Sequence, residues 1–266
     1  MRLLVLCALL AACDARLGAN ASGETGGNVD APNGGTSNGD DGGTSSNGDG
    51  GGASIPLDAP ATNACSNNRV VFLNFAGDTL TQATASDATH DEAIWVGMSN
   101  NATTATMPEW RPTAGDRTTQ IQEVVTTLQG IFGTIAPTIT FVTTRPAAGP
   151  YVMIGFGGTK GEAGVPYTGA VNHLDCGDTN KSDVGWVFES EGSIIAAANA
   201  AAGAIAFGLG ATGTTDPNDC MCSWLTQCTS NETAACSFSA TAAAQLDCSG
   251  ETDPQNDVAI LDAFCN

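Results

Sequence analysis

A long uncharged stretch in the C-terminal half constrains the fold of this chain most strongly. Residues 193–224 read SIIAAANAAAGAIAFGLGATGTTDPNDCMCSW, and no charged residue occurs before Asp216. The alanine-rich part predicts a buried helix with close packing, and Gly208 and Gly210 predict its end. A membrane span is the alternative, but the run has little bulky apolar area and lies in a cysteine-rich region. We therefore expect a structural helix.

Short strands are predicted on the N-terminal side of this helix. Runs rich in β-branched and aromatic residues occur at 69–75, 139–142, 151–156 and 184–188. Between the first two runs, residues 79–112 are polar, and we expect them to be irregular, anchored by Trp95 and Trp110.

Two further helical segments follow from apolar periodicity. Residues 116–132 are predicted to form an amphipathic helix that begins at Asp116 and ends at Gly133. Its apolar face consists of Ile121, Val124, Val125, Leu128, Ile131 and Phe132. A last amphipathic segment begins at Pro254 and is expected to dock on the core.

The N-terminus has the pattern of an export signal. Arg2 precedes an apolar core at residues 3–10 that is too short for a stable span. The sequence Leu10-Ala11-Ala12-Cys13 resembles a bacterial lipobox. This resemblance implies that residues 1–12 are removed and that Cys13 is acylated, which would anchor the protein in a membrane. An ordinary secretory signal is the alternative.

Lipidation would place the protein in the bacterial cell envelope, either periplasmic or exposed at the surface. Asp14 resembles an inner-membrane retention signal of some bacteria, although we favour the outer membrane. Residues 13–63 are rich in Gly, Ser, Asn and Asp, and we expect a disordered tether. A flexible coil of this length spans roughly 40 Å. The folded domain is expected at 64–266, with a boundary between 64–211 and 212–266.

The cysteines indicate an oxidised, exported domain. Ten are present, and Cys7 and Cys13 belong to the signal region, which leaves eight. An even number in an exported chain predicts disulfides. Most of them follow residue 219, so we expect the C-terminal third to be crosslinked to itself. The eight are Cys65, Cys176, Cys220, Cys222, Cys228, Cys236, Cys248 and Cys265.

The charge balance excludes one class of partner. A net charge of −20 argues against nucleic-acid binding, which needs a basic surface. The acidity is typical of a soluble extracytoplasmic domain. Calcium is the functional alternative, because Asp175, Asp178 and Asp183 crowd a loop around Cys176. We favour a solvated acidic loop there, and structural calcium stays open.

Residues 193–224 and the order of the elements resemble the metzincin (matrixin-like) zinc proteases. In that family a helix carries His-Glu-x-x-His-x-x-Gly-x-x-His, and a methionine turn follows beneath the metal. With Gly208 on the motif glycine, the ligand positions fall on Ala201, Ile205 and Ala211, and the general-base position falls on Ala202. Met221 takes the place of the turn methionine.

The resemblance implies an α+β fold. A mixed twisted sheet packs on two helices, followed by the methionine turn and a disulfide-rich C-terminal subdomain. Because aliphatic side chains stand at the ligand positions, we expect no zinc, no catalytic residues and no enzyme activity. The expected role is structural or binding, with a membrane partner through the lipid.

A peptide or protein ligand is expected at a groove beside the strand that contains Val184, Trp186 and Phe188, by strand addition. Two other functions stay open. One is an active secreted metal-dependent peptidase with a non-standard site, for which His90 and His173 are the available histidines. The other is a purely structural envelope protein without a groove.

Overall fold

Five strands form the central sheet of the domain. The structure is a computed structural model, and it describes residues 69–262 apart from 134, 137, 190–191, 225–227, 242–244, 246 and 249–253. The signal peptide, Cys13, the tether, Cys65 and Cys265 lie outside the described residues. In the sheet the strand order is β5-β1-β6-β8-β7. The strands are β1 (Arg69–Asn74), β5 (Ile139–Val142), β6 (Val152–Phe156), β7 (Ala170–Val171) and β8 (Val184–Val187).

The sheet is mixed. β1, β5, β6 and β8 are parallel, whereas β7 runs antiparallel to β8 and forms one edge. The four parallel strands are the ones predicted from apolar runs, and their ends agree with the prediction to within one residue. Such runs are typical of parallel strands that are buried on both faces.

A second, smaller sheet replaces the irregular region expected at 79–112. Its order is β3-β2-β4, with β2 at Asp78–Gln82, β3 at Glu92–Ala93 and β4 at Thr104–Met107. Inward-facing Leu80, Ala105 and Met107 alternate with exposed residues, mostly threonines, so one face is buried. Trp95 and Trp110 are buried, as predicted.

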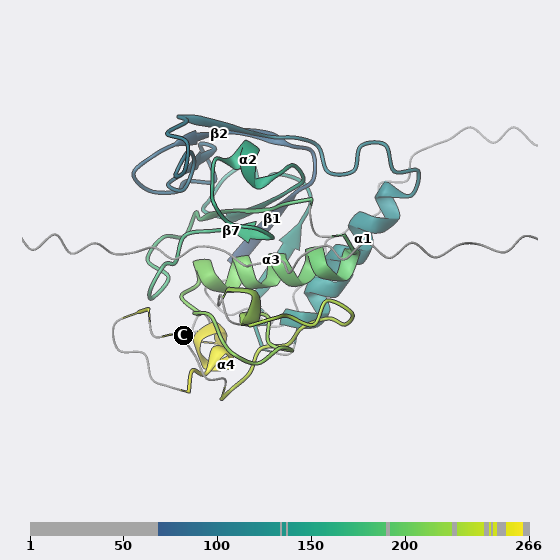
Figure 1. The fold of residues 1–266 in the computed structure, drawn as a ribbon, viewed down its shortest axis with the longest axis vertical. Helices are drawn as coiled ribbons and strands as arrows, with labels where there is room; N and C mark the ends of the chain where they lie inside the picture. The colour runs from purple at the N-terminus through teal and green to yellow at the C-terminus, as the bar shows by residue number, and fades with distance from the viewer. Residues whose placement is uncertain are drawn as a thin grey trace, which may run out of the picture.

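Two helices pack on the central sheet and on each other. Helix α1 (Arg117–Phe132) contacts β5 and helix α3 (Ile194–Gly208), and α3 contacts β6, β7 and β8. In Figure 1, α3 lies between the sheet above it and the yellow-green C-terminal segment below it. The remaining elements are the short helices α2 (Lys160–Ala163) and α4 (Asp257–Asp262) and the 3-10 turn η1 (Cys222–Trp224). The domain is therefore α+β, as predicted.

Three disulfides crosslink the described residues. Cys220–Cys236 and Cys222–Cys228 lie within the C-terminal part. Cys176–Cys248, however, joins the loop between β7 and β8 to the C-terminal part, so that part is not crosslinked only to itself. Within the described residues, no helix has both the length and the apolar character that a membrane span requires.

Candidate functional site

Helix α3 is the element around which a site would be built. The Ser193 side chain accepts a hydrogen bond from Ala196 N at 2.9 Å and caps its N-terminus. From Ala196 to Gly208 every residue of the helix is buried, because the sheet, α1 and the C-terminal part surround it. The predicted ligand and base positions Ala201, Ala202, Ile205 and Ala211 are all in this buried environment.

One face of α3 lies against the β7–β8 end of the sheet. A Cβ atom at Gly208 would lie 2.6 Å from Asn172 Nδ2 and 3.2 Å from Asp183 Oδ2. Asn172 Nδ2 also donates a hydrogen bond to Ala204 O at 2.8 Å. Residues three, four and seven apart share a helix face, so Ala201 and Ile205 lie on the same side as Gly208. The structure therefore places two of the predicted ligand positions toward the sheet.

The opposite face of α3 contacts the segment that contains Met221. Gly203 lies so close to this segment that a Cβ atom there would overlap the Trp224 ring and lie 2.8 Å from Cys220 O. Four residues further along, Phe207 stacks on Trp224 with ring centroids 4.4 Å apart. Sequence reasoning did not predict which face of α3 meets this segment, because alanines and glycines fill both faces of the helix.

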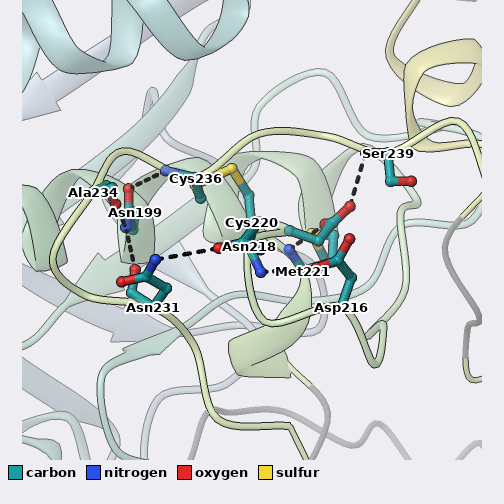
Figure 2. Close-up of a disulfide and its surroundings, with 10 residues drawn as sticks. Asn199, Asp216, Asn218, Cys220, Met221, Asn231, Ala234, Cys236 and Ser239 are labelled. Carbon is teal, nitrogen blue, oxygen red and sulfur yellow. Dashed lines mark hydrogen bonds between the residues drawn. A yellow bond between two sulfur atoms is a disulfide. The ribbon is translucent and has the colours of Figure 1, made fainter.

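Asn199 extends this contact toward the N-terminal end of α3. Its side chain accepts a hydrogen bond from Cys236 N at 3.0 Å and donates one to Ala234 O at 2.9 Å. Figure 2 shows Asn199 beside the Cys220–Cys236 disulfide, with Asn231 bridging to Asn218. The hydrogen bonds of Asn199 thus hold the loop that this disulfide closes on α3.

The turn around Met221 is closed by its own hydrogen bonds. Asp219 Oδ1 accepts a bond from Met221 N at 2.8 Å, and Met221 O accepts one from Thr214 N at 3.2 Å. Asp216 Oδ1 accepts a bond from Asn218 N at 3.0 Å, the local Asx pattern expected of this sequence. The Met221 side chain is fully buried and belongs to the hydrophobic core.

The expected peptide-binding strand is not at the edge of the sheet. β8 pairs with β6 along its whole length and with β7 at Trp186 and Val187, so it lies inside the sheet. Val184, Trp186 and Phe188 are buried in the core. The edge strand is β7, whose Ala170 and Val171 are 2% and 0% exposed. The strand was missed because two residues carry no periodic pattern.

The acidic loop between β7 and β8 is buried, in contrast to the solvated loop that we expected. Asp178 forms ion pairs with Arg69 and with Lys181, and Asp183 Oδ1 accepts a bond from Asn180 Nδ2 at 2.9 Å. Burial, followed by the charges of Asp175 and Asp178, raises the pKa of Asp183 to about 8. Asp183 is thus largely protonated at neutral pH.

The contacts of this acidic cluster can be explained without a metal ion. Arg69 and Lys181 both form ion pairs with Asp178, and Asp175 accepts hydrogen bonds from Thr179 Oγ1 at 2.7 Å and from Asn180 N at 2.6 Å. Among the residues that the structure describes, no group of three or more His, Cys, Asp or Glu side chains is placed to hold a metal. The cluster is therefore best explained as a buried polar contact between the β7–β8 loop and β1.

The two histidines lie on separate segments. His90 is exposed, and its Nδ1 lies 2.7 Å from Asp87 Oδ2 and 3.0 Å from Thr89 Oγ1. The hydrogen bond to Asp87 raises the pKa of His90. In a catalytic triad the acid and the nucleophile bond to different ring nitrogens of the histidine. Asp87 and Thr89 both contact Nδ1 of His90, so these three residues do not form a triad. Burial lowers the pKa of His173, which follows β7.

Comparisons with known proteins gave no relative. No family model, no curated protein and no solved structure matches this chain. Its function must therefore be inferred from its residues and their geometry.

Proposed function

We propose that this chain is a lipid-anchored protein of the bacterial cell envelope whose folded domain is metzincin-like, lacks a metal centre and acts without catalysis. The observation that carries this proposal is the Phe207–Trp224 stack. It fills the space between α3 and the Met221 turn, where a metzincin would hold its metal. A structural or binding role is left for the domain.

The order of the elements supports the family assignment. A mixed sheet packs on α1 and α3, and α3 is followed by a tight turn with a buried methionine and by a disulfide-crosslinked segment. These are the features that the resemblance implied. The order of the predicted elements led to the same resemblance, with Gly208 placed on the motif glycine.

The backbone favours a register shifted by two residues. Gly210 has φ +95°, a conformation that favours glycine, whereas Gly208 lies in the helix. With Gly210 on the motif glycine, the ligand positions become Gly203, Phe207 and Gly213, and the base position becomes Ala204. Gly203 and Phe207 are the residues that face the Met221 turn, which supports this register.

Neither register supplies metal chemistry. A catalytic zinc site needs three protein ligands and an open position for water, and glycine, alanine, isoleucine and phenylalanine side chains have no donor atom. Neither Ala202 nor Ala204 has a carboxylate to accept a proton from a bound water. These residues, together with their burial, support a role without hydrolysis.

The sheet edge favours a structural role over peptide capture. Strand addition needs an exposed edge, and Ala170 and Val171 of β7 are buried. In addition, Cys176–Cys248 attaches the C-terminal part to the loop that follows β7. We therefore place the structural role first and the binding of a peptide or protein ligand second.

Metal analysis and a peptidase assay test the absence of catalysis. The full chain with Cys13→Ser would be equilibrated with zinc, freed of excess metal and assayed for bound zinc and for hydrolysis of casein. We expect substoichiometric zinc and no hydrolysis. Stoichiometric zinc with hydrolysis, both lost in the His90→Ala/His173→Ala variant, would establish the alternative of a peptidase with a non-standard site.

Labelling with an alkyne fatty acid tests the anchor in cells. The wild-type chain and the Cys7→Ser variant should both take up the label and sediment with membranes. The Cys13→Ser variant should lose the label and the membrane association, because the acylated group would be missing. Absence of label from the wild-type chain, or equal labelling of Cys13→Ser, would contradict lipidation.

A further inference from the structure

The three disulfides of the described residues differ in their exposure to solvent. In Cys176–Cys248 the first cysteine is exposed and the second is half-buried. In Cys220–Cys236 both cysteines are buried, at 2% and 9% exposed. In Cys222–Cys228 the first is 0% exposed and the second is half-buried. Among the residues that the structure describes, Cys176 is therefore the disulfide-bonded cysteine that an external reagent reaches most easily.

The loop around Cys176 is open on its outer side. The next residue, Gly177, is exposed, and the position that a Cβ atom would take there has no atom within 4 Å apart from its chain neighbours. The acids on either side, Asp175 and Asp178, are buried, and Asp178 forms two ion pairs with basic side chains. A thiolate that approaches Cys176 therefore meets little steric hindrance, and the charge of Asp178 is compensated.

We propose that Cys176–Cys248 is a site of thiol–disulfide exchange, at which a dithiol releases the C-terminal part from the β7–β8 loop and leaves the contact between α3 and the Met221 turn in place. Exposed disulfides are the ones that external thiols reduce most readily. The proposal goes beyond the structural role proposed above, and it depends neither on the lipid anchor nor on the family assignment.

The exchange takes two steps and transfers two electrons. One thiolate of the dithiol attacks Cys176 Sγ, the disulfide bond breaks, and its electron pair leaves with Cys248 Sγ, which takes up a proton. The second thiolate of the dithiol then attacks the dithiol's own sulfur in the mixed disulfide and displaces Cys176 Sγ, which is protonated in turn. The dithiol ends as a disulfide, and both cysteines end as thiols.

The bridge fastens a C-terminal segment to the residues that follow α3. Gln245 N donates a hydrogen bond to Gly213 O at 2.9 Å, and Cys248 Sγ lies 4.0 Å from Gly210 O. Gln245 and Cys248 are both half-buried. By contrast, the contact between α3 and the Met221 turn is buried and is held by an aromatic stack and another disulfide. Loss of the bridge should therefore loosen the segment around Gln245 and leave the turn in place.

Stepwise reduction of the full chain with Cys13→Ser tests the order in which the disulfides open. Dithiothreitol would be added at pH 8, free thiols trapped with iodoacetamide at successive times, and each cysteine identified by peptide mass spectrometry. Cys176 and Cys248 should react at least about tenfold faster than Cys220 and Cys236, because reduction of a buried bridge needs local opening. In concentrated urea the difference should vanish. Equal rates without urea, or earlier reduction of Cys220–Cys236, would overturn the proposal.

Backbone ¹⁵N relaxation of the folded protein tests the release, and it does not depend on the global stability of the variants. In Cys176→Ser/Cys248→Ser the order parameter of the Gln245 amide should fall from about 0.85 to below about 0.6, whereas the Met221 amide should stay near 0.85. Cys222→Ser/Cys228→Ser is the matched control and should leave Gln245 rigid. An unchanged Gln245 amide would show that the bridge holds no segment, and an equal loss at Met221 would show that the turn opens too. Either result would overturn the proposal.

Discussion

Phe207 and Trp224 stack with their ring centroids 4.4 Å apart and their ring planes 24° from parallel. Phe207 belongs to α3, and Trp224 ends the 3-10 turn that follows Met221. Both rings are buried, so the contact excludes water from the interface between the helix and the turn. Aromatic packing thus fills this part of the interface between α3 and the Met221 turn.

Removal of this stack should destabilise the domain. Trp224→Ala should lower the free energy of unfolding by about 3–5 kcal/mol, because a large buried ring leaves a cavity. Trp224→Phe should cost less than half of this, because a ring remains on Phe207 and the Trp224 Nε1 group has no hydrogen-bond partner among the described residues. Urea unfolding of both variants measures the difference, and equal losses would argue against a contribution from stacking.

Two of the disulfides should differ in their contribution to stability. Cys176–Cys248 closes a separation of 72 residues, and Cys222–Cys228 closes one of 6. A longer closed loop restricts the unfolded chain more, which gives about 4 kcal/mol for the first bridge and about 2 kcal/mol for the second. Unfolding of Cys176→Ser/Cys248→Ser and Cys222→Ser/Cys228→Ser without reductant compares them. A larger loss from the shorter loop would contradict the assignment to unfolded-chain entropy.

Asp183 should make the domain less stable as the pH rises from about 4 to about 8. Its pKa is raised on folding from 3.8 to about 8, mainly by burial. In this window the unfolded chain releases the proton and the folded chain retains it, so each pH unit costs at most about 1.4 kcal/mol. Above pH 8 both states are ionised, and the effect should level off.

Asp183→Asn isolates this contribution. The amide keeps an oxygen for Asn180 Nδ2 and carries no charge, so the variant should be more stable than the wild-type protein at pH 8 and similar to it near pH 4. Urea unfolding at four pH values between 4 and 9 measures the gap. Glu123→Gln, an exposed change on α1, should leave the wild-type slope intact. A constant gap at every pH would show that Asp183 does not titrate in this window.

Apolar runs made the central sheet predictable. β1, β5, β6 and β8 are buried parallel strands, and their side chains are apolar almost without interruption. The second sheet was not predictable in the same way. Four of the nine residues in its strands β2 and β4 are threonines, and only Leu80, Ala105 and Met107 mark the buried face. The short edge strand β7 depends entirely on its pairing with β8.

The candidate site could not be predicted in the same way, because it depends on contacts between residues that are far apart in the sequence. The burial of the acidic loop follows from the pairing of Asp178 with Arg69, which is 109 residues away. Likewise, the face of α3 that meets the Met221 turn was not evident from spacing, because alanines and glycines fill both faces. The positive φ of Gly210, just after the end of α3, is likewise a backbone property that the sequence does not reveal.

Alanine substitution at two helical glycines should have opposite effects on stability. A solvent-exposed glycine inside a helix normally costs about 1 kcal/mol relative to alanine. At Gly130 in α1 the position that a Cβ atom would take has no neighbouring atom within 4 Å, so Gly130→Ala should stabilise the domain by about 0.5–1 kcal/mol. At Gly203 a Cβ atom would overlap the Trp224 ring and lie 2.8 Å from Cys220 O. Gly203→Ala should therefore destabilise the domain by at least about 1 kcal/mol, as overpacking does.

The pair of variants tests the close contact between α3 and the Met221 turn. Urea unfolding would compare Gly130→Ala, Gly203→Ala and Gly203→Ala/Trp224→Ala. Because loss of the Trp224 ring relieves part of the overlap, the double variant should lose less stability than the sum of its single changes. The Cys220 carbonyl stays in place, so the relief should be partial. Stabilisation by both single alanine changes would show that the turn lies further from Gly203 than it does in this structure.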